Sequence, residues 1–190
     1  EIIHFAEICR REVGFIRSAV SAKTKAEWES ANEKLVKYEN ITDKIEYEIA
    51  SYLNEVTKGD ISAFSALRIK SMYRVIGELE SIGDSGEAIG RMMKRALDHG
   101  KTFDEEMIKR LDRMLDLLDV AFGAMTENLS SPALFLKDIT NAEDAEYNIN
   151  EYRNRLREEH IVNIEKDDYN YQTGVFYIDI VQELEKMGDF

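Results

Sequence analysis

A ten-residue pattern near the middle of the chain returns near its end. VIGELESIGD, Val75 to Asp84, aligns with IVQELEKMGD, Ile180 to Asp189, and the offset is 105 residues at every position. Seven apolar positions of the first helical segment keep this offset, because each falls on an apolar residue between Met107 and Met125: Ile2, Ile3, Ala6, Cys9, Val13, Ile16 and Val20. A self-match at one fixed period indicates that a structural unit of about 100 residues occurs twice.

The scarcity of helix-breaking residues favours an all-α fold. The 190 residues include one proline and ten glycines, and apolar side chains recur at the three- and four-residue steps of amphipathic helices. With 44% hydrophobic and 33% charged residues, the chain is typical of a folded, soluble protein rather than a disordered one. We predict six long helices that form two tandem three-helix bundles, residues 1–99 and residues 100–190.

Capping patterns predict the helix boundaries of the first unit. Thr24 with Glu27 has the spacing of a capping box, which places a helix start at Lys25. Asp60, after a Lys-Gly stop, is expected to cap the third helix. The predicted helices span residues 1–22, 25–56 and 61–99.

The boundaries of the second unit follow from similar patterns after Gly100. Thr102 with Glu105 repeats the capping box. Ser131 and Pro132 are expected at the N-cap and in the first turn of the fifth helix. Residues 167–170 are expected to end that helix. The predicted helices span residues 103–128, 132–164 and 171–190.

The net charge of −13 is concentrated in the second half of the chain. Residues 1–95 carry 15 Lys and Arg against 16 Asp and Glu, whereas residues 96–190 carry 10 against 22. This excess of acid argues against binding to nucleic acid or to anionic lipid. It suits bound cations, although solubility alone also explains it.

Cysteine usage and hydropathy indicate the compartment. Cys9 is the only cysteine, so it cannot form an internal disulfide, and its place on an apolar stripe predicts a core residue in a reducing compartment. No apolar run reaches the ~18 residues of a membrane span, and the chain lacks a signal-peptide pattern. We therefore expect no membrane insertion by this segment. Because both ends of the sequence fall inside helical patterns, we also expect that it is a piece of a longer protein.

Motifs for nucleotide binding or nucleophilic catalysis are missing from the sequence. It has no G-x-G-x-x-G, Walker or G-x-S-x-G pattern. Glu1-x-x-His4 has the spacing of a di-iron ligand pair, but such a site needs that pair twice, and the remaining histidines, His99 and His160, are scattered. We therefore predict no catalytic residues and no enzyme activity, with a carboxylate-bridged metalloenzyme as a minor alternative.

The remaining candidates for a binding site are acid pairs spaced i, i+4. Such pairs lie on one helix face and can chelate a cation, but in so acidic a chain the spacing is no signal by itself. Two of the pairs lie on the same flank of their helices, and one recurs in the repeat. The candidate metal ligands are Glu39, Asp43, Glu80, Asp84, Glu185 and Asp189.

These pairs need compensation for their charge. Like charges four residues apart cost a few tenths of a kcal/mol on a helix, and either a bound metal or a neighbouring Lys or Arg would supply it. Gly83 and Gly188 each precede the last acid of a motif, where a glycine costs ~1 kcal/mol relative to alanine. Their position predicts the close approach of another helix or of a ligand shell.

The repeated motif resembles that of a known family. ELESIGD and ELEKMGD resemble the signature that closes the third helix of each repeat in PhoU proteins, and Glu39-Asn-Ile-Thr-Asp43 resembles that family's E-x-x-x-D motif. The resemblance implies tandem three-helix bundles, a role in phosphate signalling, and clusters of iron or zinc on the six acids named above. Metal is not expected to be required for the fold.

A longer stretch, Tyr52 to Asp84, is similar to the cytoplasmic PhoU-like tail of bacterial sodium-phosphate cotransporters. This implies a regulatory domain on the cytoplasmic face of the inner membrane, tethered to an upstream transmembrane transporter of the same polypeptide. The alternative is a free-standing PhoU-like adaptor that regulates a separate phosphate transporter and its sensor kinase. A homodimer is also left open, and no nucleic-acid partner is expected.

The second unit departs from the motif. At an offset of 104, Glu39 and Asp43 correspond to Glu143 and Tyr147, and a tyrosine is a poor substitute for a carboxylate. We therefore expect metal to bind the first unit better than the second. Ligands that are all carboxylates favour Mg²⁺, Ca²⁺ or Mn²⁺ and can also hold iron.

Overall fold

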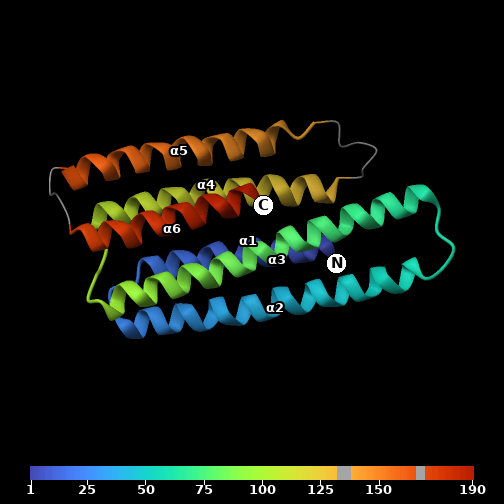
Figure 1. Cartoon of the computed structure of the whole chain (residues 1–190), viewed down its shortest axis with the longest axis horizontal. Coiled ribbons are helices and arrows are strands. Elements are labelled where there is room, and N and C mark those ends of the chain that lie inside the picture. Colours follow the sequence, from blue (N-terminus) through green and yellow to red (C-terminus); the bar gives the residue numbers. More distant parts are fainter. Residues whose placement is uncertain (132–137, 166–169) are drawn as a thin grey trace.

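The computed structural model contains six α-helices and describes residues 1–131, 138–165 and 170–190, without a strand among them (Figure 1). The all-α prediction is therefore confirmed. The helices are α1 (Ile2–Val20), α2 (Lys25–Thr57), α3 (Ala63–Asp98), α4 (Glu105–Ser130), α5 (Thr140–Glu165) and α6 (Tyr171–Asp189).

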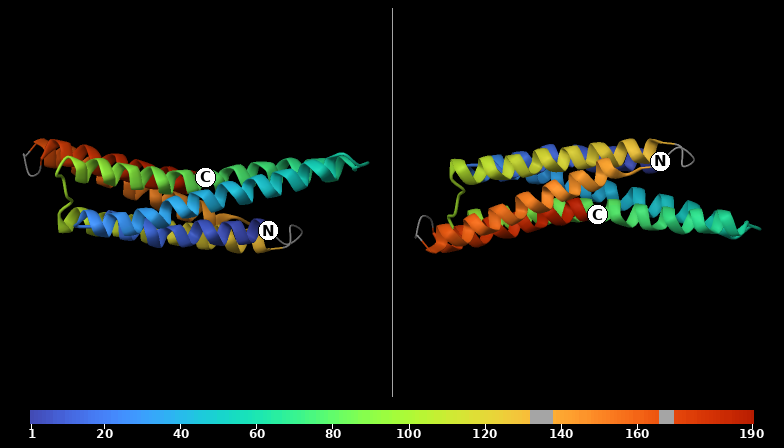
Figure 2. Two further views of the ribbon diagram at one scale, coloured as in Figure 1. Left: turned by 90° about the horizontal axis from the view of Figure 1, so that it is seen from below. Right: turned by 90° about the horizontal axis from the view of Figure 1, so that it is seen from above.

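The helices pack as two groups of three. Helices α1, α2 and α3 contact one another, as do α4, α5 and α6, and the two groups meet where α1 contacts α4 and α3 contacts α6. These contacting helices occupy equivalent places in the repeat and run in opposite directions (Figure 1). Side views place α1 with α4 on one side and α3 with α6 on the other (Figure 2). This arrangement agrees with an approximate two-fold relation between the units.

One hydrophobic core runs through both groups. Phe5 and Ile16 of α1, Leu79 of α3, Leu118 of α4 and Leu184 of α6 are almost fully buried in a single apolar cluster. The units of the repeat therefore share their interior, because α1 and α4 bury apolar stripes against each other. The division at residues 99 and 100 stays a prediction about the repeat.

The ends of the first-unit helices agree only partly with expectation. The capping box is present: the Glu27 N–H donates to Thr24 Oγ1 at 3.2 Å, and the Thr24 N–H donates to the Glu27 carboxylate at 3.2 Å. The prediction that Asp60 caps α3 is wrong. Ser62 has this role, since its hydroxyl accepts from the Ser65 N–H at 3.1 Å. Serine and aspartate are equally good N-caps, so composition could not choose between them.

Gly100 ends α3 and turns the chain into the second unit. Its φ of +65° is readily adopted by glycine, and the Lys101 N–H donates to the Ala96 carbonyl at 2.9 Å, as in a Schellman motif. Asp104 then caps α4 by accepting from the Met107 N–H at 2.8 Å. The predicted Thr102–Glu105 capping box is therefore wrong, because a carboxylate two residues further on takes the cap.

The predicted start of the fifth helix is also wrong. Ser131 closes α4, with its N–H donating to the Asn128 carbonyl at 3.2 Å, and α5 begins only at Thr140. Pro132 lies outside the described residues. Residues 167–169 of the predicted break also lie outside them, but Asn170 caps α6 by accepting from the Gln172 N–H at 3.1 Å.

Helices α2 and α3 are much longer than α1, with 33 and 36 residues against 19. Their hairpin therefore extends beyond the other helices (Figures 1 and 2). In the part of the chain that the structure describes, no helix is both long and apolar enough to span a bilayer.

Candidate metal centre

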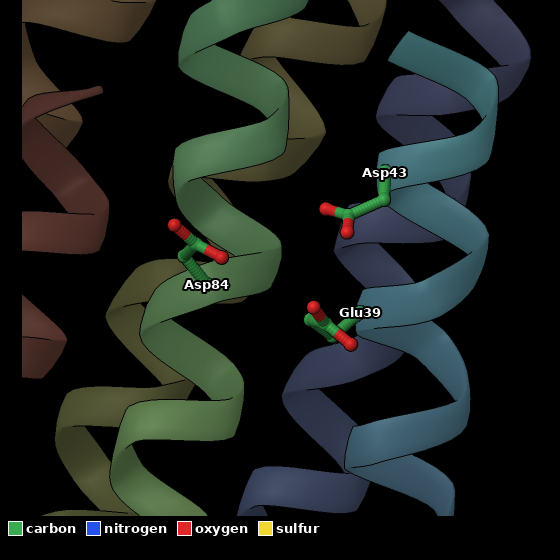
Figure 3. Close-up of side chains that lie close together, drawn as sticks. All are labelled: Glu39, Asp43 and Asp84. Atoms are coloured by element: carbon green, nitrogen blue, oxygen red, sulfur yellow. The ribbon is translucent and has the colours of Figure 1, made fainter. Parts of the chain in front are cut away.

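Helices α2 and α3 bring three of the predicted ligands together. Glu39 and Asp43, one turn apart on α2, face Asp84 of α3 (Figure 3). One carboxylate oxygen from each residue lies within 4.8 Å of the others. Asp43 and Asp84 are exposed and Glu39 is half-buried, so a cation could reach the group from solvent.

Glu80 lies one turn before Asp84 and belongs to the same electrostatic environment, although it is not one of the three converging carboxylates. Partial burial, followed by the charges of Asp84, Glu46 and Asp43, raises the pKa of Glu80 above its ordinary value. Burial together with Asp43, Glu87 and Asp84 raises the pKa of Glu39 in the same way. A bound cation would relieve this repulsion.

The two units compensate their acids differently. Within the described residues, no Lys or Arg forms an ion pair with Glu39, Asp43, Glu80 or Asp84. In the second unit, by contrast, Arg153 of α5 contacts Glu185 of α6 at 2.8 Å. Of the two explanations considered from the sequence, the basic neighbour is present for Glu185, and bound metal in the first unit stays a prediction. A guanidinium compensates Glu185, whereas the acids of the first unit have no basic partner among the described residues.

Asp189, the second acid of that pair, is exposed and joins no group of three or more potential ligands among the described residues. The structure thus brings together Glu39, Asp43 and Asp84, places Glu80 beside them, and separates Glu185 and Asp189 from them. The six predicted ligands do not form two equivalent sites.

The motif glycines allow helices to approach closely, as predicted. A Cβ on Gly83 would lie 2.4 Å from Thr42 Oγ1, beside the converging acids. A Cβ on Gly188 would lie 2.8 Å from Ile149 Cδ1. In both units, then, the helix before the motif packs directly against the glycine.

These contacts correct the register of the second unit. Thr42 and Ile149 occupy equivalent places, so the offset in this helix is 107 residues rather than 104. The buried residues Ile49 and Leu53 then correspond to Leu156 and His160, which are also buried.

With the corrected register, Asp43 corresponds to Asn150, and the earlier match with Tyr147 is wrong. Tyr147 is 65% exposed, and its side chain points away from the core. Glu39 corresponds to Glu146 instead of Glu143. The second unit still lacks the complete acid pair, because an amide replaces one carboxylate.

Glu12 is a further acidic residue near this site, although it is not one of the three converging carboxylates, and the motifs in the sequence did not single it out. It lies on α1, is 0% exposed, and neither of its carboxylate oxygens has a hydrogen-bond partner. Burial, then the charges of Glu39 and Asp84, raises its pKa well above the ordinary value. The sequence pattern could have predicted the burial of Glu12, because this residue falls on the apolar stripe between Cys9 and Ile16 at helical spacing.

The donor set suits a hard cation. Glu39, Asp43 and Asp84 offer only oxygen atoms, and Cys9, the one thiol, is buried and donates to the Leu79 carbonyl at 3.3 Å. Oxygen ligands favour Mg²⁺, Ca²⁺ or Mn²⁺, and carboxylates can also bridge iron. The three carboxylates without a basic partner, and the two Glu12 oxygens without a hydrogen-bond partner, are compatible with such an ion.

Comparisons with known proteins agree with this fold. No protein-family model and no curated protein sequence matches the chain. The crystal structure of PhoU from Pseudomonas aeruginosa matches it with a TM-score of 0.82 and 16% sequence identity, over 99% of this chain and 87% of that one. The chain therefore has the PhoU-like, all-α fold that the motif resemblance implied.

Proposed function

We propose that this chain is a regulatory domain of phosphate transport that holds a divalent cation or iron between α2 and α3. The observation that carries the proposal is the convergence of Glu39, Asp43 and Asp84, without a basic partner in the described part, on a PhoU-like fold. In the form we favour, the domain belongs to a sodium-dependent phosphate transporter at the cytoplasmic face of the bacterial inner membrane.

A cation at this position would connect the two longest helices of the fold. Glu39 and Asp43 would bind it from α2 and Asp84 from α3, while Gly83 keeps the helices close enough to share it. Binding would then favour one relative position of α2 and α3, which is how site occupancy could reach a partner.

Elemental analysis of the purified protein tests the site. We expect bound metal in the wild type and its loss in the Asp43→Asn, Asp84→Asn double variant, because two of three converging carboxylates become neutral amides. Glu78→Gln, an exposed acid on α3 outside the site, is the control. Equal metal content in the wild type and the double variant would refute the assignment.

Phosphate uptake by cells tests the regulatory role. Cells that produce the Asp43→Asn, Asp84→Asn variant from the complete gene should take up phosphate at an altered rate, whereas the Glu78→Gln variant should behave as wild type. Unchanged uptake despite loss of the metal would separate metal binding from regulation.

The second candidate is a free-standing adaptor that acts on a separate transporter. It is favoured by the match of almost the whole chain to a PhoU structure. Several apolar helices encoded directly upstream of Glu1 would support the tethered form, and a start codon within a few residues would support the adaptor.

We further propose that the domain has no catalytic activity of its own. In the described residues, the acids of the site have no neighbouring nucleophile arranged with a base. Phosphatase or oxidase turnover by the purified protein that disappears in a Glu80→Gln variant would contradict this.

A further inference from the structure

Glu12 is a buried acid whose position needs a physical explanation. A carboxylate without exposure and without a hydrogen-bond partner is costly, and Glu39 and Asp84 add their repulsion to that cost. Leucine at the same point of the α1 stripe would pack against α2 and α3 without this penalty. Something that favours a carboxylate here must therefore offset the cost.

The backbone of α3 leaves room for this carboxylate. A Cβ on Gly86 would lie 2.2 Å from Glu12 Oε1 and 2.5 Å from its Cδ, so any larger residue at this position would force the carboxylate of Glu12 to move. Gly86 is two residues after Asp84, inside a helix where glycine costs about 1 kcal/mol relative to alanine. The pair Glu12–Gly86 therefore carries two local penalties beside the converging acids.

The repeat supplies an internal comparison. At the offset of 105 residues that relates α1 to α4, the counterpart of Glu12 is Leu117. The unit with Leu117 is also the unit in which Asn150 replaces an acid and Arg153 neutralises Glu185. The buried carboxylate occurs in the unit that has the converging acids, and an apolar side chain takes its place in the other.

We propose that Glu12 is an additional ligand, contributed by α1, of the cation held by Glu39, Asp43 and Asp84. This inference rests on the proposed metal site and extends it from two helices to three. The ion would neutralise the buried carboxylate and satisfy its free oxygens. All three helices of the first unit would then be linked through one hard cation.

Titration of the metal-free protein with Mn²⁺ tests this role. By calorimetry, we expect Glu12→Gln and Glu12→Leu to weaken Mn²⁺ binding about tenfold or more relative to wild type. Glu78→Gln, on the exposed face of α3, should bind as wild type does. Wild-type affinity in both Glu12 variants would overturn the inference.

Thermal unfolding with and without Mn²⁺ provides a second readout. In chelator, Glu12→Leu should melt at a higher temperature than wild type, because a buried carboxyl group without a hydrogen-bond partner is replaced by an apolar side chain. With Mn²⁺ present, the order should reverse. If Glu12 has only a structural role, Glu12→Gln and Glu12→Leu should both be less stable than wild type in chelator. Mn²⁺ should then raise their melting temperatures as much as it raises that of the wild type.

The outcomes separate the two proposals. If the wild type binds Mn²⁺ and the Glu12 variants bind it equally well, the three-carboxylate site stands and the role of Glu12 is refuted. If the wild type itself binds neither Mn²⁺ nor iron, both proposals fail. Should Glu12→Leu not fold, Gly86→Ala tests the same contact, since it displaces the carboxylate and should also weaken Mn²⁺ binding.

Discussion

At the scale of single residues, glycines decide how closely the helices around the acids can pack. Gly83 and Gly86 lie one turn apart on α3, and a side chain from another helix packs closely against each of them. The side chain of Thr42 packs against Gly83, and that of Glu12 packs against Gly86. Gly77 lies on the same helix, but a methyl group added there would meet no neighbouring side chain within 4 Å. The same residue type therefore has different consequences at these positions.

Gly83→Ala and Gly77→Ala should have opposite effects on stability. An added methyl at position 83 would lie 2.4 Å from Thr42 Oγ1 and 3.1 Å from its Cβ, so we expect a loss of about 1–3 kcal/mol in the free energy of unfolding. At Gly77 the helix propensity of alanine should give a gain of up to about 1 kcal/mol. Denaturant unfolding measures both, and a neutral Gly83→Ala would contradict the close contact.

The acids of the site predict a pH dependence for the metal-free protein. The pKa values of Glu39 and Glu80 are raised above 4.5, so the folded state holds these protons more tightly than the unfolded chain does. The contribution of these two groups to stability is therefore fully present below about pH 4.5. It is lost as the pH rises through their raised pKa values. In chelator, these two groups should make the melting temperature fall between about pH 5 and about pH 7, relative to a variant that lacks both carboxylates.

Two controls accompany this measurement. The lowered pKa values of Asp98 and Asp119 affect stability only below their ordinary value of 3.8, but burial also lowers the pKa of His160 below 6.5, which favours the higher pH, so a Glu39→Gln, Glu80→Gln variant is measured in parallel. Addition of Mn²⁺ should remove most of the difference, because a cation favours the ionised carboxylates. The same pH dependence in the metal-free wild type and in the Glu39→Gln, Glu80→Gln variant would show that the acids do not repel one another as proposed.

At the scale of helices, the register of α2 against α3 and of α5 against α6 explains why the units differ. With the offset of 107 residues, Arg153 is the counterpart of Glu46. Glu46 adds to the charges that raise the pKa of Glu80, whereas Arg153 forms an ion pair with Glu185, the counterpart of Glu80. One change of charge sign on the neighbouring helix thus separates an acid cluster from a compensated pair.

Glu46→Arg should give the acids of the first unit the kind of basic partner that the second unit has. The introduced guanidinium is expected to pair with Glu80 as Arg153 pairs with Glu185, which would raise the melting temperature in chelator and weaken Mn²⁺ binding. Glu48→Arg, on an exposed part of the same helix, is the matched control. Unchanged melting of Glu46→Arg in chelator would contradict the proposed register.

At the scale of the whole molecule, the protruding α2–α3 hairpin differs from the shared core. Its outer half carries large exposed apolar side chains, including Tyr52, Phe64 and Leu67, beside a groove that Ile45 and Met72 also line. Helix α1 is too short to cover this part of the hairpin. Leu79, further along α3, is 2% exposed within the core that both units share.

Substitutions in the two parts should differ in cost. Phe64→Ser, at a side chain that is 70% exposed, should change the free energy of unfolding by no more than about 0.5 kcal/mol. Leu79→Ala should cost about 2–5 kcal/mol, because it leaves a cavity between the units. Denaturant unfolding compares them, and a large cost for Phe64→Ser would mean that the hairpin is covered in solution.

The sequence by itself determined the helices, their number and the pairing of acids within each helix. These features depend on neighbours three or four residues away, so the step from Glu39 to Asp43 places both carboxylates on one face wherever the helix packs. Helix ends were less certain, because adjacent polar residues such as Asp60 and Ser62 compete for one cap.

Only the tertiary structure decided which side chains meet between helices. The burial of Glu12, the contact of Thr42 with Gly83 and the pairing of Arg153 with Glu185 depend on how each helix is shifted and rotated against its neighbours. Packing of the shared core sets that shift, and connecting segments of different length change it between the units. The match of Asp43 with Tyr147 failed for this reason, since one turn of slippage exchanges every partner across the helix interface.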